Sequence, residues 1–256
     1  MNKKENKKDR AKIAKARTET MKRTYPENIN HSIKRSEIFG ENGKSPAIDE
    51  NIERSEPEII FENKDSVSAL FDNHKGKTVL LNFASYKNPG GGFIKGASAQ
   101  EEDLCHESFL YNVLVANANY YEYNNEHKNR ALYTDRALYT PDIVFERKNQ
   151  SVACDVISCS SPNKTASEKY SNVSPEENYE ALKNRITLIK DVAEYKKVST
   201  LILGAFGAGV FKQDPEDVAK LFKSVFEKTT VKRLVFAVPG KDENMKVFKK
   251  YFGQNI

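Results

Sequence analysis

Residues 78–102 read TVLLNFASYKNPGGGFIKGASAQEE and contain three different structural signals in succession. The apolar run Thr78–Ala84 is typical of a strand that is buried on both faces. Asn88-Pro-Gly-Gly-Gly92 follows and is incompatible with regular secondary structure. A helix is expected over residues 98–115, with Ser98 and Glu101 as a capping box at its start. The segment therefore predicts a buried strand, a glycine-rich loop and a helix, which is the repeating unit of α/β proteins.

Similar signals alternate along much of the chain. Further strands are predicted at residues 58–62, 137–139, 143–146, 152–159, 200–203 and 234–238, and further helices at 9–23, 65–73, 174–195, 214–228 and 242–252. Residues 24–57 are polar, rich in Asn, Ser and Glu, and are expected to form an irregular connection. The alternation predicts a single α/β domain in the form of a sandwich with a mixed central sheet.

The charge of the chain is unevenly distributed. The 256 residues hold 41 Lys and Arg against 36 Asp and Glu, a net charge of +5. Residues 1–24 contain ten bases and three acids, so the remaining residues carry 31 bases and 33 acids. Because the body is not basic, we do not expect nucleic-acid binding.

The basic segment itself has two interpretations. A helix over residues 9–23 would place Ile13, Ala16, Thr20 and Met21 on one face, as a narrow stripe that docks on the body. The alternative is a polybasic anchor for an anionic polymer. We favour docking, because an apolar stripe needs a surface to pack against.

Composition excludes several other classes of protein. No apolar run approaches the ~20 residues that span a bilayer, and the N-terminus lacks the apolar core of a secretory signal. The odd number of cysteines (Cys105, Cys154 and Cys159), without a CxxC motif, fits a reducing, cytoplasmic setting. The four histidines are scattered, so neither a metal site nor a metal cofactor is expected.

Two glycine-rich loops are candidates for ligand binding. One is the loop that ends at Gly92, and the other is residues 204–211, with Gly-x-x-Gly-x-Gly spacing. Each follows a buried strand and precedes a helix, where α/β proteins bind ligands and where backbone N–H groups can converge on an anion. The spacing matches neither a Walker A loop nor a dinucleotide-binding fingerprint. Two such loops together favour a diphosphate ligand.

Two adjacent glutamates follow the first loop. Glu101 would occupy the capping-box position, but that role does not explain Glu102, which points about 100° away around the helix. A glutamate beside a ligand loop can protonate a leaving oxygen or stabilise a developing cation. Asp155 is a separate candidate, because an acid within the apolar run VACDVISC needs a partner such as an adenine amine or a ligand-loop N–H group.

Residues 82–102 closely resemble the signature of bacterial-type poly(ADP-ribose) glycohydrolases, macrodomain-fold enzymes marked by GGG, a short spacer and QEE. Asp155-Val-Ile-Ser and Ser161-Pro-Asn163 resemble the central strand of that family and the turn after it. Residues 204–211 with Asp214-Pro215 resemble its diphosphate loop, and the Arg17-x-Glu19-Thr20 helix resembles its N-terminal extension. The resemblance spans most of residues 9–252.

The resemblance implies a three-layer α/β/α macrodomain-like catalytic domain over residues 58–256, with residues 1–57 as a basic helical extension packed on it. The implied reaction is hydrolysis of ribose–ribose bonds with release of ADP-ribose, Glu102 being the catalytic acid and Glu101 holding ribose hydroxyls. The implied ligand-binding residues are Asn88, Gly90, Gly91, Gly92, Gln100, Gly204, Phe206, Gly207, Ala208, Gly209, Val210 and Phe211.

No metal or cofactor is implied. The expected partners are ADP-ribose, its polymer and ADP-ribosylated proteins, bound by a monomer. Two alternatives remain open, namely a hydrolase of mono-ADP-ribosylated protein or nucleic acid and a non-catalytic ADP-ribose-binding module. The intact glutamate pair argues against pure binding, because binding alone does not require it.

Overall fold

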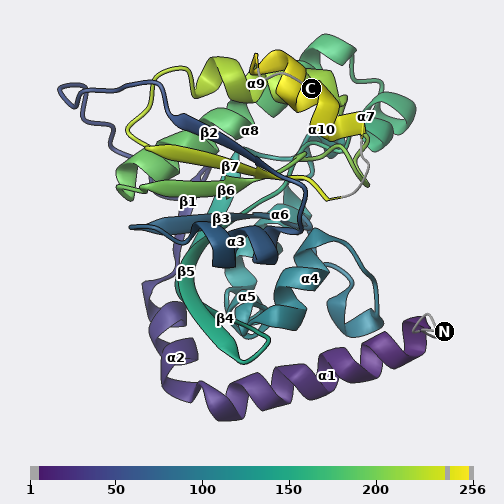
Figure 1. The fold of residues 1–256 in the computed structure, drawn as a ribbon. Coiled ribbons are helices and arrows are strands. Elements are labelled where there is room, and N and C mark those ends of the chain that lie inside the picture. Colours follow the sequence, from purple (N-terminus) through teal and green to yellow (C-terminus); the bar gives the residue numbers. More distant parts are fainter. Residues whose placement is uncertain (1–5, 240–242, 254–256) are drawn as a thin grey trace.

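A seven-stranded mixed sheet forms the middle layer of the molecule (Figure 1). The structure is a computed structural model that describes residues 6–239 and 243–253. The strand order is β1-β4-β5-β3-β6-β7-β2; β5 to β2 run parallel, whereas β1 pairs antiparallel with β4 and β4 with β5. The strands are β1 (Glu37–Gly40), β2 (Glu58–Glu62), β3 (Thr78–Phe83), β4 (Arg136–Arg147), β5 (Gln150–Cys159), β6 (Thr200–Leu203) and β7 (Arg233–Ala237).

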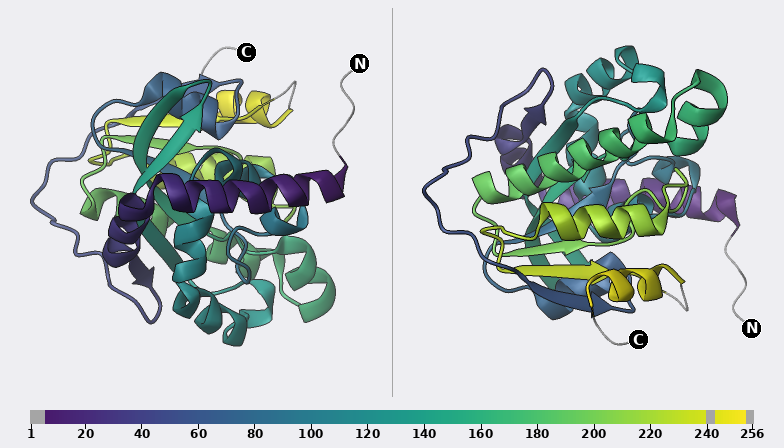
Figure 2. Two further views of the ribbon diagram at one scale, coloured as in Figure 1. Left: turned by 90° about the horizontal axis from the view of Figure 1, so that it is seen from below. Right: turned by 90° about the horizontal axis from the view of Figure 1, so that it is seen from above.

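Helices cover both faces of this sheet. The upper layer in Figure 1 contains α7 (Lys164–Ser171), α8 (Pro175–Tyr195), α9 (Pro215–Val225) and α10 (Glu243–Tyr251). Below the sheet lie α1 (Lys7–Thr24), α2 (Pro26–Arg35), α3 (Ser66–Asn73), α4 (Gln100–Glu107) and α5 (Leu110–Ala116), and α6 (Ala118–Glu126) packs Tyr120 and Tyr121 into the same lower core. Seen from below, α1 runs across the middle of the molecule in front of the other elements (Figure 2). The predicted three-layer α/β/α sandwich is confirmed.

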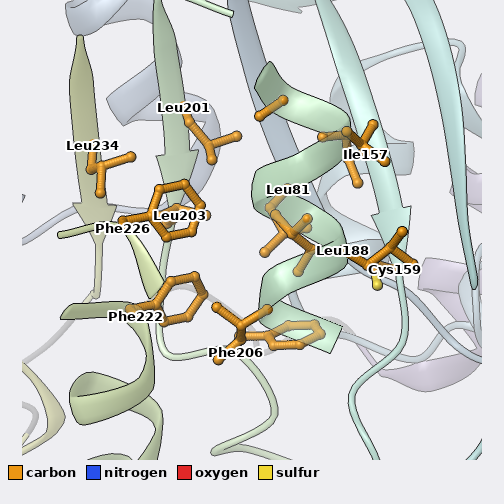
Figure 3. Close-up of a cluster of buried hydrophobic side chains, with 14 of the residues drawn as sticks. Leu81, Ile157, Cys159, Leu188, Leu201, Leu203, Phe206, Phe222, Phe226 and Leu234 are labelled. Carbon is orange, nitrogen blue, oxygen red and sulfur yellow. The ribbon is translucent and has the colours of Figure 1, made fainter. Parts of the chain in front are cut away.

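The side chains of β3 alternate between two cores. Val79 and Leu81 point into the upper core and Leu80 into the lower one, and none of the three is exposed. Figure 3 shows the upper core, where Leu81 and Leu203 from the sheet lie among side chains of α8 and α9. A strand buried on both faces reads as a continuous apolar run, which is why this strand could be predicted.

The segment between residues 24 and 57 is more regular than predicted. α2 starts at Pro26, where the fixed φ of proline suits the first turn, and its Ile29 joins the lower core. β1 pairs with β4 in the register Phe39↔Ala137. Phe39 is fully buried, so tertiary packing stabilises a strand that is too short to stand out in a polar sequence. The division at residue 57 stays a prediction, although β1 belongs to the sheet.

The predicted helix over 9–23 is confirmed, but its docking stripe is wrong in part. Of the four residues predicted to dock, only Met21 is buried, and Ile13 is 44% exposed. Arg10 and Arg17 lie on the same face as Met21, and each donates an Nε hydrogen bond of 3.0 Å, Arg10 to the carbonyl of Gly96 and Arg17 to that of His106. α1 is therefore attached largely by arginine hydrogen bonds, which an apolar pattern does not reveal.

The predicted helix over 98–115 is two helices. α4 begins at Gln100 after Ala99, whose side chain cannot cap, and Ser98 is exposed, so the predicted capping box is wrong. Ser108 ends α4, because its hydroxyl donates to the carbonyl of Leu104 and accepts from the N–H of Leu110.

The remaining differences are smaller. The strands predicted at 137–139 and 143–146 form the single strand β4, with an irregularity between Thr140 and Ile143. The short helix α7 was not predicted, and α9 ends at Val225 rather than 228. Residue 242, the predicted start of the last helix, lies outside the described residues, and α10 runs from Glu243. None of the helices within residues 6–239 and 243–253 is long and apolar enough to span a membrane.

Candidate active site

A cleft of about 540 Å³ opens at the carboxyl ends of β3, β6 and β7. Its walls include residues 65–67 at the start of α3, 83–85 after β3, 98–104 at the start of α4, 205–207 and 209–211 after β6, and 237–239 after β7. Parallel strands end at one edge of a sheet, so the fold brings together two glycine loops that are more than 100 residues apart.

Glu101 is held at the floor of this cleft and is only 4% exposed. Its Oε2 accepts a 2.8 Å hydrogen bond from the backbone N–H of Ser85, and Asn82 Nδ2 lies 3.2 Å from its Oε1. Burial raises the pKa of Glu101 to about 8, and the neighbouring charge of Glu102 acts in the same direction, although these two hydrogen bonds oppose it. Glu101 therefore keeps its proton to a higher pH than an exposed carboxyl group does.

Asn82 can accommodate that proton. Within the described residues its buried Oδ1 has no hydrogen-bond partner, while its Nδ2 faces Glu101 and lies 3.0 Å from the hydroxyl of Ser158. An amide oxygen and nitrogen differ by a 180° rotation. In the rotated state Oδ1 would accept the O–H group of protonated Glu101.

Glu102 is 6% exposed and faces the same point of the cleft. Its Oε1 accepts a 2.8 Å hydrogen bond from the N–H of Gly92, and within the described residues its Oε2 has no hydrogen-bond partner. Gly91 has φ +60°, and a Cβ there would lie 2.6 Å from Glu102 Oε1 and 2.9 Å from Glu101 Oε2. The two carboxyl groups thus converge on one glycine that has room for no side chain.

Gln100 connects α4 to β3. Its Nε2 donates to the carbonyl of Leu81 at 2.8 Å, and its Oε1 accepts from the N–H of Phe83 at 2.9 Å. The side-chain amide therefore continues the hydrogen bonding of the strand and fixes the first turn of α4. This is a positioning contact, and direct contact of Gln100 with a ligand stays a prediction.

The second glycine loop forms the opposite wall of the cleft. Phe206 is buried against Phe83, with ring centroids 5.7 Å apart, and Phe211 lies edge-on to Tyr133 at 6.0 Å. Val210 is 78% exposed although it lines the cleft, so its side chain is available to a ligand. The loop thus has a buried aromatic base and an accessible tip.

The structure places the predicted site residues in two groups. Nine line the cleft, namely Gly91, Gln100, Glu101, Glu102, Phe206, Gly207, Gly209, Val210 and Phe211. Five lie outside its lining, namely Asn88, Gly90, Gly92, Gly204 and Ala208. Among these, Asn88 is exposed on the first loop, whereas Gly90 is buried with its Cα facing Tyr111.

Two residues that hold Glu101 were not predicted. Ser85 follows β3, and Asn82 is the one amide side chain within the apolar run 78–84. A polar residue in a buried strand was therefore the available signal for Asn82. Ser85 contributes its backbone N–H, which no side-chain pattern can reveal.

Asp155 lies away from this cleft. It pairs in register with Val79 near the start of β3, at the opposite end of the strand from the glycine loop. Its carboxylate accepts from the hydroxyl of Tyr139 and from the backbone N–H of Asp142, the latter at 2.9 Å. The predicted partner, an adenine amine or a ligand-loop N–H, is therefore wrong.

In the described part of the chain, none of the three cysteines lines the cleft. The three cysteines are buried and free, and burial raises the pKa of the Cys159 thiol to about 12, so a reactive thiolate is disfavoured. No group of three or more His, Cys, Asp or Glu side chains there could hold a metal ion.

The fold is an α/β/α macrodomain-like sandwich, and its cleft holds a pair of buried carboxyl groups. Residues 5–148 match the family described as microbial-type PARG, catalytic domain, where PARG stands for poly(ADP-ribose) glycohydrolase. The chain belongs to this family and is a poly(ADP-ribose) glycohydrolase by class.

Solved structures agree with this assignment. Poly(ADP-ribose) glycohydrolase from Thermomonospora curvata is 24% identical with a TM-score of 0.83, and the match covers 96% of this chain and 100% of that one. The Deinococcus radiodurans enzyme in complex with ADP-ribose is 26% identical with a TM-score of 0.76, over 88% of this chain and 97% of that one. No curated protein matches the chain.

Proposed function

We propose that this chain releases ADP-ribose from poly(ADP-ribose) by hydrolysing ribose–ribose bonds with Glu102 as general acid. The observation that carries the proposal is the convergence of two buried carboxyl groups on Gly91, beside a cleft whose other wall is a glycine loop. The cleft volume of about 540 Å³ is within the range of small-molecule sites. The Deinococcus relative was solved with ADP-ribose bound, which supports the same ligand here.

The two glycine loops bind the diphosphate in this proposal. Backbone N–H groups in such loops can approach an anion closely because no side chain intervenes. Binding the diphosphate fixes the attached ribose, so binding energy far from the bond orients the reacting carbon next to Glu102.

Glu102 is the better placed of the two glutamates for proton transfer. Both carboxyl oxygens of Glu101 face donors of the protein, Ser85 and Asn82, whereas Glu102 Oε2 has no hydrogen-bond partner within the described residues. Glu101, neutral at pH 7, holds the ribose hydroxyls without adding a charge next to the diphosphate.

The reaction then balances with one water molecule. The form of Glu102 that reacts carries a proton. As the glycosidic C–O bond breaks, its electron pair moves to the leaving oxygen, which takes this proton. Positive charge develops at the anomeric carbon and is stabilised by the Glu102 carboxylate. Water adds to that carbon and returns a proton to Glu102, so the products are ADP-ribose and a polymer that is one unit shorter.

We also propose the partners of the enzyme, its oligomeric state, its location and its division into domains. The partners are the polymer and the ADP-ribosylated proteins that carry it, and a monomer acts in the cytoplasm. Residues 1–57 form an extension that packs on a catalytic domain over residues 58–256.

A substrate panel at fixed enzyme concentration tests the proposal against the two alternatives. The panel contains poly(ADP-ribose), a mono-ADP-ribosylated protein and a mono-ADP-ribosylated nucleic acid, with the products separated by size. We expect ADP-ribose from the polymer at a rate far above that from either mono-ADP-ribosylated substrate. Turnover of a mono-ADP-ribosylated substrate alone would favour the second hydrolase, and binding without turnover would favour a binding module.

A further inference from the structure

We propose that the solvent-facing side of α1 is a second binding surface for the anionic polymer, for units that extend beyond the cleft; this inference rests on the proposed function. The surface, here called the α1 basic stripe, consists of Lys8, Lys12, Lys15, Lys22 and Arg23. All five side chains are exposed, and their spacing places them along one face of the helix. Glu19 is the one acidic residue on that line.

The α1 basic stripe points away from the body of the protein. Arg10, Ala14, Arg17 and Met21 repeat at the same helical spacing and form the docked face of α1. At 100° per residue the two sets lie on nearly opposite sides of the helix. Arg17 is paired with Glu146 at 2.8 Å, whereas no residue of the stripe has an ion-pair partner within residues 6–239 and 243–253.

The stripe begins next to the loop that contacts Glu102. The carbonyl oxygen of Lys7 is packed so tightly on Gly96 that a Cβ there would lie 2.0 Å from it. Gly96 closes the 3₁₀ turn Phe93–Lys95, and the next residue, Ala97, donates its N–H to the carbonyl of Gly92 at 3.0 Å. The same Gly92 donates its own N–H to Glu102.

From that loop, α1 continues outward along the lower layer. Figure 1 shows its amino-terminal end on the side of α4 and its other end next to α2, with the helix beneath α4 and α5. Lys95, in the 3₁₀ turn of this loop and next to Gly96, is exposed and adds another positive charge near the start of α1. A chain that leaves the cleft on this side therefore meets positive charge immediately.

Charge complementarity identifies the occupant. Each ADP-ribose unit carries a diphosphate, so the substrate is a polyanion, and flexible lysines bind such chains without reading a sequence. The body offers no general attraction, since residues 25–256 contain 31 bases and 33 acids. From Lys8 to Lys22 the helix rises about 21 Å, so the stripe reaches units that the cleft cannot hold.

Charge reversal on the stripe tests this inference. We expect the triple variant K8E/K12E/K15E to lose about tenfold in kcat/KM on long polymer at low salt, as expected for lost electrostatic steering. On a chain of two ADP-ribose units the loss should stay below about twofold, and at about 0.5 M salt the two long-polymer rates should converge.

A matched control carries the same charge change at the opposite end of the sheet. Lys197, Lys228 and Lys232 are exposed and lie before β6 and β7, away from the cleft. K197E/K228E/K232E should cleave long polymer within about twofold of wild type. An equal loss in both triple variants, or none in the stripe variant, would overturn the inference.

Binding of long polymer, measured in parallel, separates this inference from the proposed function. If wild type cleaves neither substrate, the proposed function fails, and the stripe is then judged by whether K8E/K12E/K15E alone weakens polymer binding. Because all three lysines are exposed, thermal unfolding should match wild type. If the triple variant is unstable, Lys12→Glu alone replaces it, and we then expect a smaller loss in kcat/KM on long polymer.

Discussion

Gly91 lies where the two glutamate carboxyl groups meet, and its replacement tests how closely they must approach. Gly91→Ala places a methyl group within 2.6 Å of Glu102 Oε1, at a φ of +60° that alanine adopts at a cost. We expect polymer hydrolysis to fall at least about 100-fold, because displacement of the acid by 1 Å can have such an effect. The stability loss should be about 1–2 kcal/mol. Steady-state kinetics and denaturant unfolding measure both.

Gly209→Ala is the natural comparison for stability. A Cβ at Gly209 meets nothing within 4 Å in the free protein, so the free energy of unfolding should be unchanged. Any loss of ADP-ribose affinity in Gly209→Ala would then arise from the ligand itself. A Gly91→Ala enzyme with normal turnover would contradict the described convergence of the two glutamates.

Individual site residues were predictable to different degrees. Glu102 could be selected from the sequence because no helix-capping role explained it. Glu101 was assigned to a capping box, yet its carboxyl group reaches back to Asn82 on the preceding strand and to Ser85 just after it. Such contacts depend on the distance between β3 and α4, which local sequence does not encode.

Elements with a strong apolar pattern or clear caps were predicted well. β3 and β6 are largely apolar runs, and the predicted helix over 174–195 is α8, which begins with a capping box of Ser174 and Glu177. β1 and α2 were missed because their stability comes from pairing with β4 and from packing on the lower core. The break between α4 and α5 depends on one serine hydroxyl, and helix-forming residues on both sides conceal it.

The contacts that attach the helix α1 to the body give a prediction for its contribution to stability. Arg17 donates from Nε to the carbonyl of His106 at 3.0 Å and from Nη2 to Glu146 at 2.8 Å, and its side chain is largely buried. Arg17→Ala should lower the free energy of unfolding by about 1–2 kcal/mol, because both acceptors lose a charged donor. Lys12→Ala, on the opposite face of α1, should leave stability within about 0.5 kcal/mol of wild type. Equal stability of both variants would show that these arginine contacts do not hold α1.

The alternation of buried strands and helices predicted a sandwich with a central sheet. It did not predict which basic residues of the N-terminal helix face the body and which face solvent. Arithmetic placed the excess of bases within the first 24 residues. Only the structure separates Arg10 and Arg17, which dock α1, from the basic residues of the α1 basic stripe, which face solvent. The ten bases of residues 1–24 therefore include residues that attach α1 to the body and residues that are free to bind an anionic chain.

Global stability should depend on pH through Glu101. Its pKa rises from an ordinary value of 4.5 to about 8 on folding, so between these values the folded protein binds more protons at this site than the unfolded chain does. Stability contributed by this group is complete below pH 4.5 and is lost as the pH rises through about 8. Glu101→Gln removes this titration, so its melting temperature relative to wild type should increase from pH 5 to pH 8.5. A difference that is independent of pH would show that Glu101 does not retain its proton on folding.

The proposed role of Glu102 is tested most directly by Glu102→Gln, assayed for release of ADP-ribose from poly(ADP-ribose) at saturating polymer. Glutamine retains the shape of the side chain and an oxygen for the N–H of Gly92, but it supplies neither a proton nor a negative charge. We predict a loss of at least about 1,000-fold in kcat, from the combined loss of acid catalysis and charge stabilisation. ADP-ribose affinity should stay within about threefold, and Glu122→Gln, an exposed control on α6, should turn over normally. Turnover by Glu102→Gln close to that of wild type would contradict the assignment of Glu102 as the acid.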